Sequence, residues 1–391
     1  MTVTIVRVPA AADPTAIVAS DDAAILVRRA ALWAMVVAKL IGGWGVQWDI
    51  QWHVRIGRDS FWIAPHVMTY AGVAGAVLVS FGILGWDTWR RRTAGPDRDA
   101  MTVMGLTSTP GFHLAAWGIA LTVLAAPIDD LWHRMFGIDV TLWSPPHLLG
   151  MLGSLINTAA CLLIAREVYP HGGLACTTAL IVNAAMLLGG FATTAQPSFR
   201  LAYLHGGLAF HLYAILGALL FPIAYLTAAR LTGLRIAPVL VLVVSLLNGM
   251  IGVQIARLGF DVLRPESVIE AEIAKDPESP IAVAQAIARK NGAQPGTQRA
   301  VSQWSSLIAV LVMVAVGPRK RPAIAAVAYA IALLATMGSV LAWSPAFAPM
   351  APGAGATFAG LVLAIVAAFI AAHCARWLAV VLDARDTVRT R

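Results

Sequence analysis

Residues 48–53 read Trp-Asp-Ile-Gln-Trp-His, and residues 129–133 read Asp-Asp-Leu-Trp-His. Both stretches belong to a longer pattern that occurs twice. Five positions recur in the same order, 80 residues apart except for the last pair, which is 81 apart: Asp49 and Asp129, Trp52 and Trp132, His53 and His133, Asp59 and Asp139, and His66 and His147. Because charged residues make up only 12% of the chain, five such matches indicate an internal duplication.

Each copy combines two histidines with one carboxylate. An Asp and a His four residues apart share a helix face, so Asp49 with His53, and Asp129 with His133, can present an oxygen and a nitrogen to one point. The third residue of each copy is a histidine after a proline, which is common in the first turn of a helix. This ligand set suits copper, zinc or non-haem iron. The alternative is that these residues are helix caps and hydrogen-bonded pairs at a membrane interface.

The first copy has a more specific signature, Asp49-x2-Trp52-His53-x4-Arg58-Asp59-x6-His66. It resembles the metal-binding signature found in a membrane subunit of the particulate methane and ammonia monooxygenase family, the copper membrane monooxygenases. The resemblance implies a copper ion bound by Asp49, His53 and His66. It covers about residues 30–165 only, which is typical of a distant relative or a separate branch.

The second copy also fits this family, in which an amide residue precedes a His by four positions and another His follows fourteen residues later. Asp129, His133 and His147 have that spacing, although Asp129 replaces the amide. The resemblance implies a neighbouring metal site that draws on Asp129, His133 and again His66.

Other residues are candidates to support the metal ligands. A carboxylate that accepts an imidazole N–H fixes the orientation of a ligand histidine, and the expected supporting residues near the site are Arg58, Asp59, Asp139, Tyr70, Trp52 and Trp132. His205 is a further candidate ligand. Lys39 is an isolated cation inside the first apolar run, where it either pairs with a carboxylate or extends toward the membrane surface.

The composition predicts an all-α, polytopic integral membrane helical bundle. Hydrophobic residues make up 59% of the chain and its mean hydropathy is +0.75, well above the values of soluble domains. The formal net charge of +8 comes from basic residues in short loops, which indicates membrane orientation and no nucleic-acid partner. The three cysteines have no paired spacing, so no disulfide framework or thiolate metal site is expected.

About ten transmembrane helices are expected, with a parallel internal repeat in the first four. The predicted spans are about 30–48, 61–86, 111–128, 145–166, 174–194, 203–229, 236–258, 303–317, 322–343 and 357–380. The basic clusters then place both termini in the cytoplasm and both metal motifs at the extracytoplasmic face of the cell membrane.

The expected organisation has five parts. They are a cytoplasmic segment (1–24), a duplicated metal-motif domain (25–170, with repeats at about 30–92 and 111–172), further transmembrane helices (173–258), an extracytoplasmic polar insertion (259–302), and the last helices with a cytoplasmic tail (303–391). The insertion is expected to be partly helical, and it is either a lid over the motif face, a docking surface or an exposed connector.

The leading functional hypothesis is a copper-dependent, monooxygenase-like oxidoreductase that oxidises a small lipophilic or reduced substrate with dioxygen. The sequence has no CxxCH haem motif, so electrons would come from a quinol or a partner. Membrane lipid, additional membrane or soluble subunits and an electron donor are the expected partners, and a homo-oligomer is one option. The alternatives are a non-catalytic copper-binding, transport or homeostasis protein and a zinc-dependent membrane hydrolase.

Overall fold

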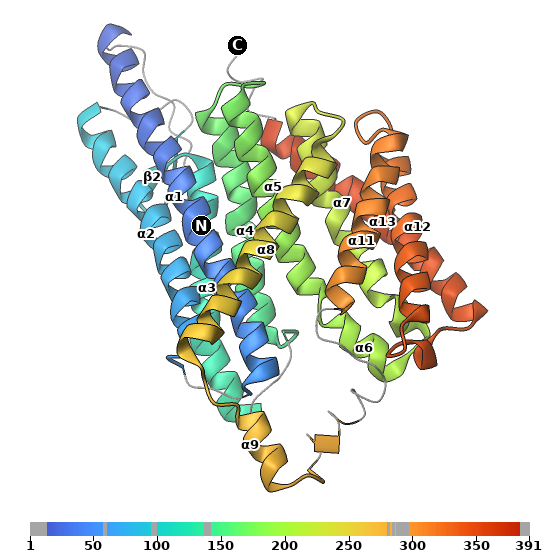
Figure 1. Cartoon of the computed structure of the whole chain (residues 1–391). Helices are drawn as coiled ribbons and strands as arrows, with labels where there is room; N and C mark the ends of the chain where they lie inside the picture. Colours follow the sequence, from blue (N-terminus) through green and yellow to red (C-terminus); the bar gives the residue numbers. More distant parts are fainter. Residues whose placement is uncertain are drawn as a thin grey trace. The chain divides into compact units, whose positions relative to one another are not determined.

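The computed structural model describes residues 14–57, 61–94, 100–136, 142–279, 282–283, 286 and 297–383. Helices dominate this part of the chain (Figure 1). The only strands in it, β1 (Met101–Val103) and β2 (Leu106–Ser108), form one antiparallel hairpin. The predicted all-α helical membrane bundle is confirmed.

Most of the helices are long and carry apolar side chains on all sides. Their bounds are α1 Pro14–Arg55, α2 Ala64–Ala94, α3 Pro110–Phe136, α4 Pro145–Val168, α5 Leu174–Ala195, α6 Ser198–His205, α7 Leu212–Thr232, α8 Ala237–Leu263, α9 Val268–Lys275, α11 Thr297–Val316, α12 Pro322–Trp343 and α13 Ala354–Asp383. Short 3₁₀ turns, η1 (Gly207–His211) and η2 (Ala348–Met350), precede α7 and α13.

Eight helical segments in the described part are long and apolar enough to cross a membrane. They are Ala64–Arg92, Pro110–Phe136, Pro145–Val168, Leu174–His205, Gly207–Thr232, Ala237–Leu263, Pro322–Trp343 and Ala354–Asp383. They coincide with eight of the predicted spans. Helices α1 and α11, which contain the other two, are not among them, and α11 has only a shorter apolar stretch, Ser302–Val316. The protein is therefore a membrane protein, but the count of ten is not confirmed.

The chain forms two compact units, which are described separately. Residues 1–45 and 66–183 form the first unit, and residues 46–65 and 184–391 form the second. The predicted domain boundaries, the orientation in the membrane and the cytoplasmic location of the termini stay predictions.

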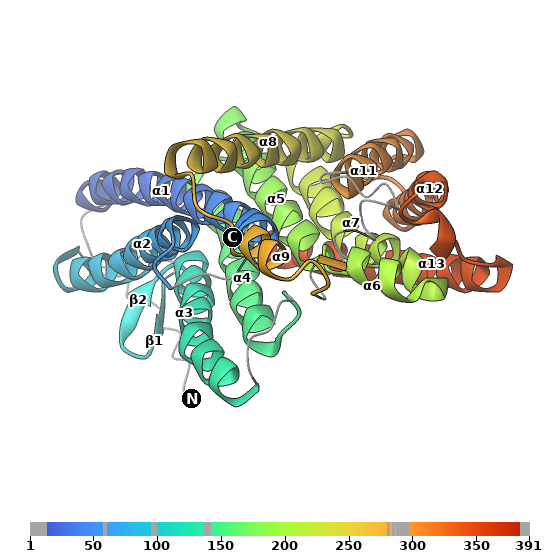
Figure 2. The ribbon, with the colours of Figure 1, turned by 60° about the horizontal axis from the view of Figure 1, so that its bottom comes forward.

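In the first unit, glycines allow α3 and α4 to pack closely. A Cβ atom on Gly118 would lie 2.8 Å from the Asn157 nitrogen, and one on Gly153 would lie 2.6 Å from the Thr122 nitrogen. These distances are too short for carbon next to nitrogen, so only glycine fits at either position. Figure 2 shows the two helices as neighbours, with the β1–β2 hairpin beside α2 and α3.

Polar contacts fasten one end of the α3–α4 hairpin. Glu167, near the carboxyl end of α4, accepts hydrogen bonds from the Thr109 hydroxyl (2.5 Å) and the Gly111 nitrogen (2.8 Å) at the start of α3. In the same unit, buried Arg28 of α1 pairs with buried Asp87 of α2 at 2.8 Å. The end of α3 and the start of α4 therefore lie at the opposite end of this hairpin from Glu167.

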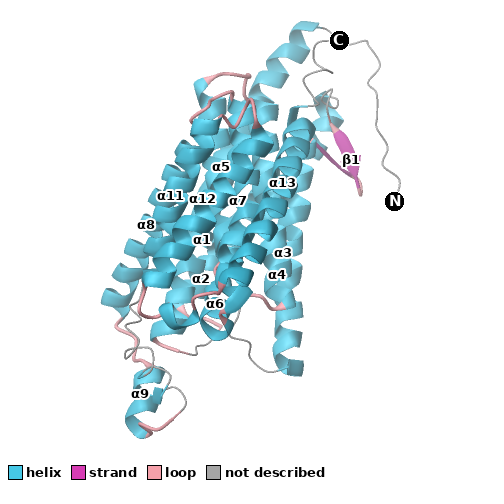
Figure 3. Ribbon diagram, turned by 90° about the vertical axis from the view of Figure 1, so that its right-hand side faces the viewer, coloured by secondary structure: helices cyan, strands magenta, loops and turns pink. Residues whose placement is uncertain are grey.

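The second unit has a helix break that differs from the prediction. The sixth span was expected to begin near residue 203, but α6 ends at His205 and α7 begins at Leu212. Gly206 and Gly207 both have positive φ, 58° and 51°, which interrupts a regular helix. Within this unit α7 packs against α12 and α13, and Figure 3 shows these three running side by side.

Candidate metal centre

Asp129 and His133 lie one turn apart in the last part of α3. The ion pair between Asp129 Oδ2 and His133 Nε2 is 3.4 Å long, as expected for an Asp and a His at i and i+4. Pro127 lies inside the helix two residues before Asp129 and removes a backbone donor there. The adjacent carboxylate, Asp130, instead pairs with the exposed Arg134 at 2.7 Å. Asp129 is thus the residue of this acidic pair that faces the histidines.

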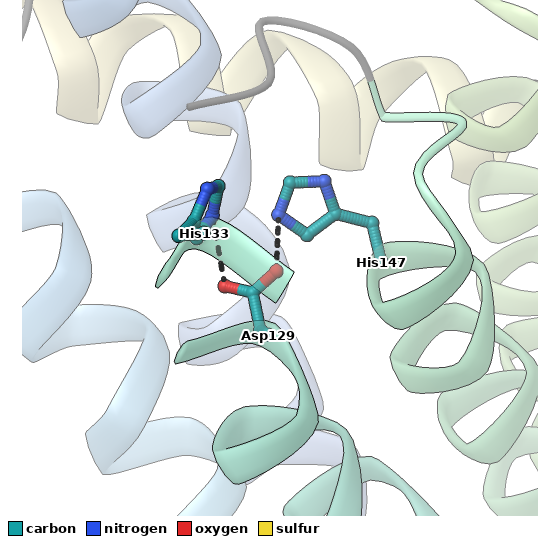
Figure 4. A group of neighbouring side chains, drawn as sticks. All are labelled: Asp129, His133 and His147. Atoms are coloured by element: carbon teal, nitrogen blue, oxygen red, sulfur yellow. Dashed lines mark ion pairs between the residues drawn. The ribbon is translucent and has the colours of Figure 1, made fainter. Parts of the chain in front are cut away.

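His147 reaches the same point from the first turn of α4. Ser144 is the N-cap and prolines occupy the first helical positions, so the helix starts as the sequence predicted. His147 Nε2 lies 3.5 Å from Asp129 Oδ1. Figure 4 shows the carboxylate between the two imidazoles, with one oxygen directed to each ring.

The three side chains form a compact group of metal-ligand atoms. One atom from each of Asp129, His133 and His147 can be chosen so that all three lie within 4.8 Å of one another. The ring centroids of the two histidines are 6.4 Å apart. All three side chains are about one-third exposed, at 29–35%. In the part of the chain that the structure describes, this is the one group of three or more such ligands.

The geometry fits a transition-metal ion. Ligands at about 2.0–2.1 Å from a tetrahedral ion are roughly 3.4 Å apart, close to the 3.4 and 3.5 Å separations of the two Asp–His pairs. Asp129 Oδ1 is buried and makes no hydrogen bond among the described residues. A small rotation of the side chains would bring all three atoms to coordination distance, because 4.8 Å exceeds the tetrahedral separation by about 1.4 Å.

The first motif occupies the equivalent place on α1 and belongs to the second unit. Asp49 and His53 lie in the last two turns of the helix, and His53 Nδ1 is 3.4 Å from Asp49 Oδ1 and 3.0 Å from the Asp49 carbonyl oxygen. His53 is the more exposed of the two, with 47% of its side-chain surface accessible against 25% for Asp49. The i and i+4 arrangement is therefore present in both copies.

Aromatic residues fix the end of α1 that carries Asp49 and His53. Trp52 stacks on Phe260 of α8 with ring centroids 5.8 Å apart, and Trp48 meets the same ring edge-on at 6.3 Å. The Arg55 guanidinium lies 4.2 Å from the Phe260 ring centre. Trp52 thus supports the motif by packing.

The polar insertion is bonded to the same end of α1. The nitrogens of Val268 and Ile269 donate to the Ile56 carbonyl oxygen at 2.8 and 3.4 Å, and the Ser267 hydroxyl donates to the Arg55 carbonyl oxygen at 2.8 Å. Helix ends leave carbonyl groups without intrahelical partners, so α9 and the residue before it satisfy the last carbonyls of α1. Of the three interpretations of the insertion, direct contact with the motif helix is the one that the second unit shows.

His66 lies in the first turn of α2, as predicted, and its ring is 5.9 Å from that of Tyr70 one turn later. His66 belongs to the first unit, whereas Asp49 and His53 belong to the second. The predicted sets that join His66 to either motif therefore stay predictions.

The remaining candidates fall in several places. Arg58, Asp59 and Asp139 lie outside the described residues. Trp132 packs against Phe136, with ring centroids 4.4 Å apart. His205 ends α6 and belongs to no group of three metal-ligand residues in the described chain.

Sequence reasoning missed the surroundings of Lys39. Its ammonium nitrogen donates to the Asn157 side-chain oxygen at 2.9 Å and to the Ser154 carbonyl oxygen at 3.2 Å, both on α4. Neither expected arrangement, a carboxylate pair or a side chain extended to the surface, describes these contacts. A buried Asn in an apolar span was the available signal, but an amide can bond to any neighbouring helix.

Comparison with known proteins adds no relative. No protein-family model matches the chain, and neither a curated protein nor a solved structure matches it. The functional argument therefore depends on the geometry of the site and on the resemblance of its motifs.

Proposed function

We propose that this membrane protein binds a transition-metal ion through Asp129, His133 and His147. The observation that carries the proposal is the convergence of three ligand atoms within 4.8 Å from two helices. The carboxylate and the histidines come from a pattern that the chain contains twice, which a chance pairing of helix-end residues does not explain.

Copper is the metal we propose first. Two imidazoles and one carboxylate also suit zinc and iron, so the donor set alone does not select copper. The preference comes from the resemblance of the duplicated motif to copper-binding subunits of membrane monooxygenases. By the same resemblance, Asp49, His53 and His66 would form a second site of the same kind.

A catalytic role follows as a finer proposal, namely oxidation of a small lipophilic or reduced substrate with dioxygen. Three protein ligands leave coordination positions open, and a bound copper ion would supply the redox chemistry there. Asp129 would hold the ion and offset part of its charge, while the two histidines fix its position between α3 and α4. The apolar spans around the site would admit a substrate dissolved in the bilayer, with electrons from a quinol or a partner protein.

Metal handling without catalysis is the second candidate. The side chains are about one-third exposed, so the site is accessible enough for an ion to exchange. A zinc-dependent hydrolase uses the same donors with a bound water and is the third candidate.

The test is metal content by inductively coupled plasma mass spectrometry on protein purified in native lipid. Wild type is compared with Asp129→Ala and His133→Ala, and His171→Ala is the matched control, because His171 lies in the turn between α4 and α5. We expect the first two variants to lose one metal equivalent and the control to keep it.

The outcome also separates the candidate functions. Metal that stays in both site variants would refute binding at this centre. Copper with substrate-dependent oxygen uptake would support the oxidase, copper without it would support metal handling, and zinc would support the hydrolase.

A further inference from the structure

Lys39 holds a cation at the middle of the first unit. Its two partners, Ser154 and Asn157, lie near the centre of the 24-residue helix α4, which is a candidate membrane span. Asn157 is fully buried and donates its amide to the Ala115 carbonyl oxygen of α3 at 2.8 Å. Three helices thus meet at this lysine.

Both groups that bind the ammonium are neutral. Among the described residues Lys39 has no carboxylate partner, although such a partner is the usual compensation for a charge in a membrane. The Cys161 thiol of α4 is the titratable group that interacts with it. The α2 residues that pack on this part of α1, Gly72, Gly75 and Ala76, have no titratable side chain.

The metal centre is on the same helix as these partners. His147 precedes Ser154 and Asn157 by seven and ten residues, so the ammonium lies about 10–15 Å from it along α4. The Thr122 hydroxyl, which donates to the Gly150 carbonyl oxygen at 3.0 Å, lies between the two levels. A charge in the protein interior acts strongly over this distance, because little water is present to screen it.

We propose that metal binding at Asp129, His133 and His147 releases the proton of Lys39. The inference rests on the proposed metal centre. In the balanced step, the Lys39 ammonium becomes a neutral amine and one proton passes to water as the divalent ion binds. Lys39 is thus a charge-compensating residue, and its neutral form keeps the hydrogen bonds to Asn157 and Ser154.

Coulomb's law gives the size of the effect. Asp129 offsets one charge of a divalent ion, which leaves one net positive charge near the fixed positive charge of an ammonium. At about 12 Å and an effective dielectric constant of about 20, this repulsion weakens metal affinity about tenfold. Loss of the proton removes the repulsion.

The experiment is calorimetric titration of the full chain in lipid nanodiscs with Zn²⁺, which is redox-inert. Titrations in buffers of different ionisation enthalpy give the number of protons released. At about pH 8 the histidines are mainly neutral, so they contribute little. Lys39→Met removes the proton and the charge, Lys39→Arg keeps a permanent charge, and Lys320→Met is the matched control at an exposed lysine.

We expect wild type and Lys320→Met to release up to about one proton more than Lys39→Met or Lys39→Arg. We also expect Lys39→Arg to bind Zn²⁺ about tenfold more weakly than Lys39→Met. Both differences should vanish in a His133→Ala background. Equal proton release in all variants, with equal affinity of the Met and Arg variants, would overturn the proposal.

A second variant covers the case in which neither Lys39 variant folds. Asn157→Asp places a carboxylate beside the ammonium and should keep it charged, so proton release should fall while the lysine remains. Unchanged release in this variant would also contradict the inference. If wild type binds no more Zn²⁺ than His133→Ala, the metal centre itself fails, which is a different result.

Discussion

Replacing Gly153 by alanine tests the link between helix packing and the metal centre. The new Cβ atom would lie 2.6 Å from both the nitrogen and the hydroxyl oxygen of Thr122, and 2.7 Å from the Gly118 carbonyl oxygen. Two of these three atoms belong to the α3 backbone, so they cannot move by a side-chain rotation. Normal contact begins near 3.5 Å, so α3 and α4 would have to separate by about 1 Å.

The expected loss of stability follows from three contributions. Overpacking of this kind costs about 1–3 kcal/mol. Weakening of the 3.0 Å hydrogen bond from Thr122 to the Gly150 carbonyl adds about 0.5–1.5 kcal/mol. Alanine is the better helix former by about 1 kcal/mol, which offsets part of the loss. We therefore expect Gly153→Ala to lower the free energy of unfolding by about 1–3 kcal/mol.

The same shift should disturb the metal ligands, because Asp129 is on α3 and His147 is on α4. A displacement of about 1 Å exceeds the tolerance of metal–ligand distances, about 0.2 Å. We expect metal affinity to fall about ten- to hundredfold, as it does when groups that orient ligands are removed.

Two measurements test these expectations. One is denaturant unfolding in mixed micelles, and the other is metal titration of the purified protein. The matched control is Gly85→Ala in α2, where a Cβ atom meets nothing within 4 Å and should stabilise the helix by up to about 1 kcal/mol. Wild-type stability and metal affinity in Gly153→Ala would refute the close approach of α3 and α4.

Two further substitutions probe other contacts. Arg28→Met leaves Asp87 as a buried carboxylate without its 2.8 Å ion pair, so we expect a loss of about 3–5 kcal/mol in the free energy of unfolding. The double variant with Asp87→Leu should recover most of it, and equal losses in both would contradict a buried charge pair. Gly259→Ala places a Cβ atom 2.1 Å from the Trp48 ring and should displace the indole, with a red-shifted tryptophan emission and a loss of about 1–3 kcal/mol. Gly43→Ala, whose Cβ atom has nothing within 4 Å, is the control, and unchanged emission in Gly259→Ala would contradict the packing.

The sequence predicted the parts of the structure that depend on short-range geometry. Apolar runs of membrane-spanning length predicted most spans, because backbone groups in lipid must be satisfied within each helix. The four-residue spacing of Asp129 and His133 predicted their shared helix face, and the prolines predicted the position of His147. The duplication then made the second motif as strong a candidate as the first.

The sequence did not predict features that depend on contacts between distant residues. Lys39 and Asn157 are 118 positions apart, and their hydrogen bond depends on how α1 packs against α4. The bond from Ser267 to Arg55 spans 212 positions. The break at Gly206 was also missed, because adjacent glycines occur within membrane helices as well as between them.

The fastened end of the α3–α4 hairpin gives the metal ligands a particular mechanical setting. Glu167 holds the helices together at one end and the glycine contacts hold them in the middle, whereas Asp129 and His147 sit at the far tips. The hairpin therefore resembles a pair of tweezers, in which a small bend at Pro127 changes the separation of the tips while the handle stays closed. An ion could then be captured or released by bending alone, without unfolding of either helix.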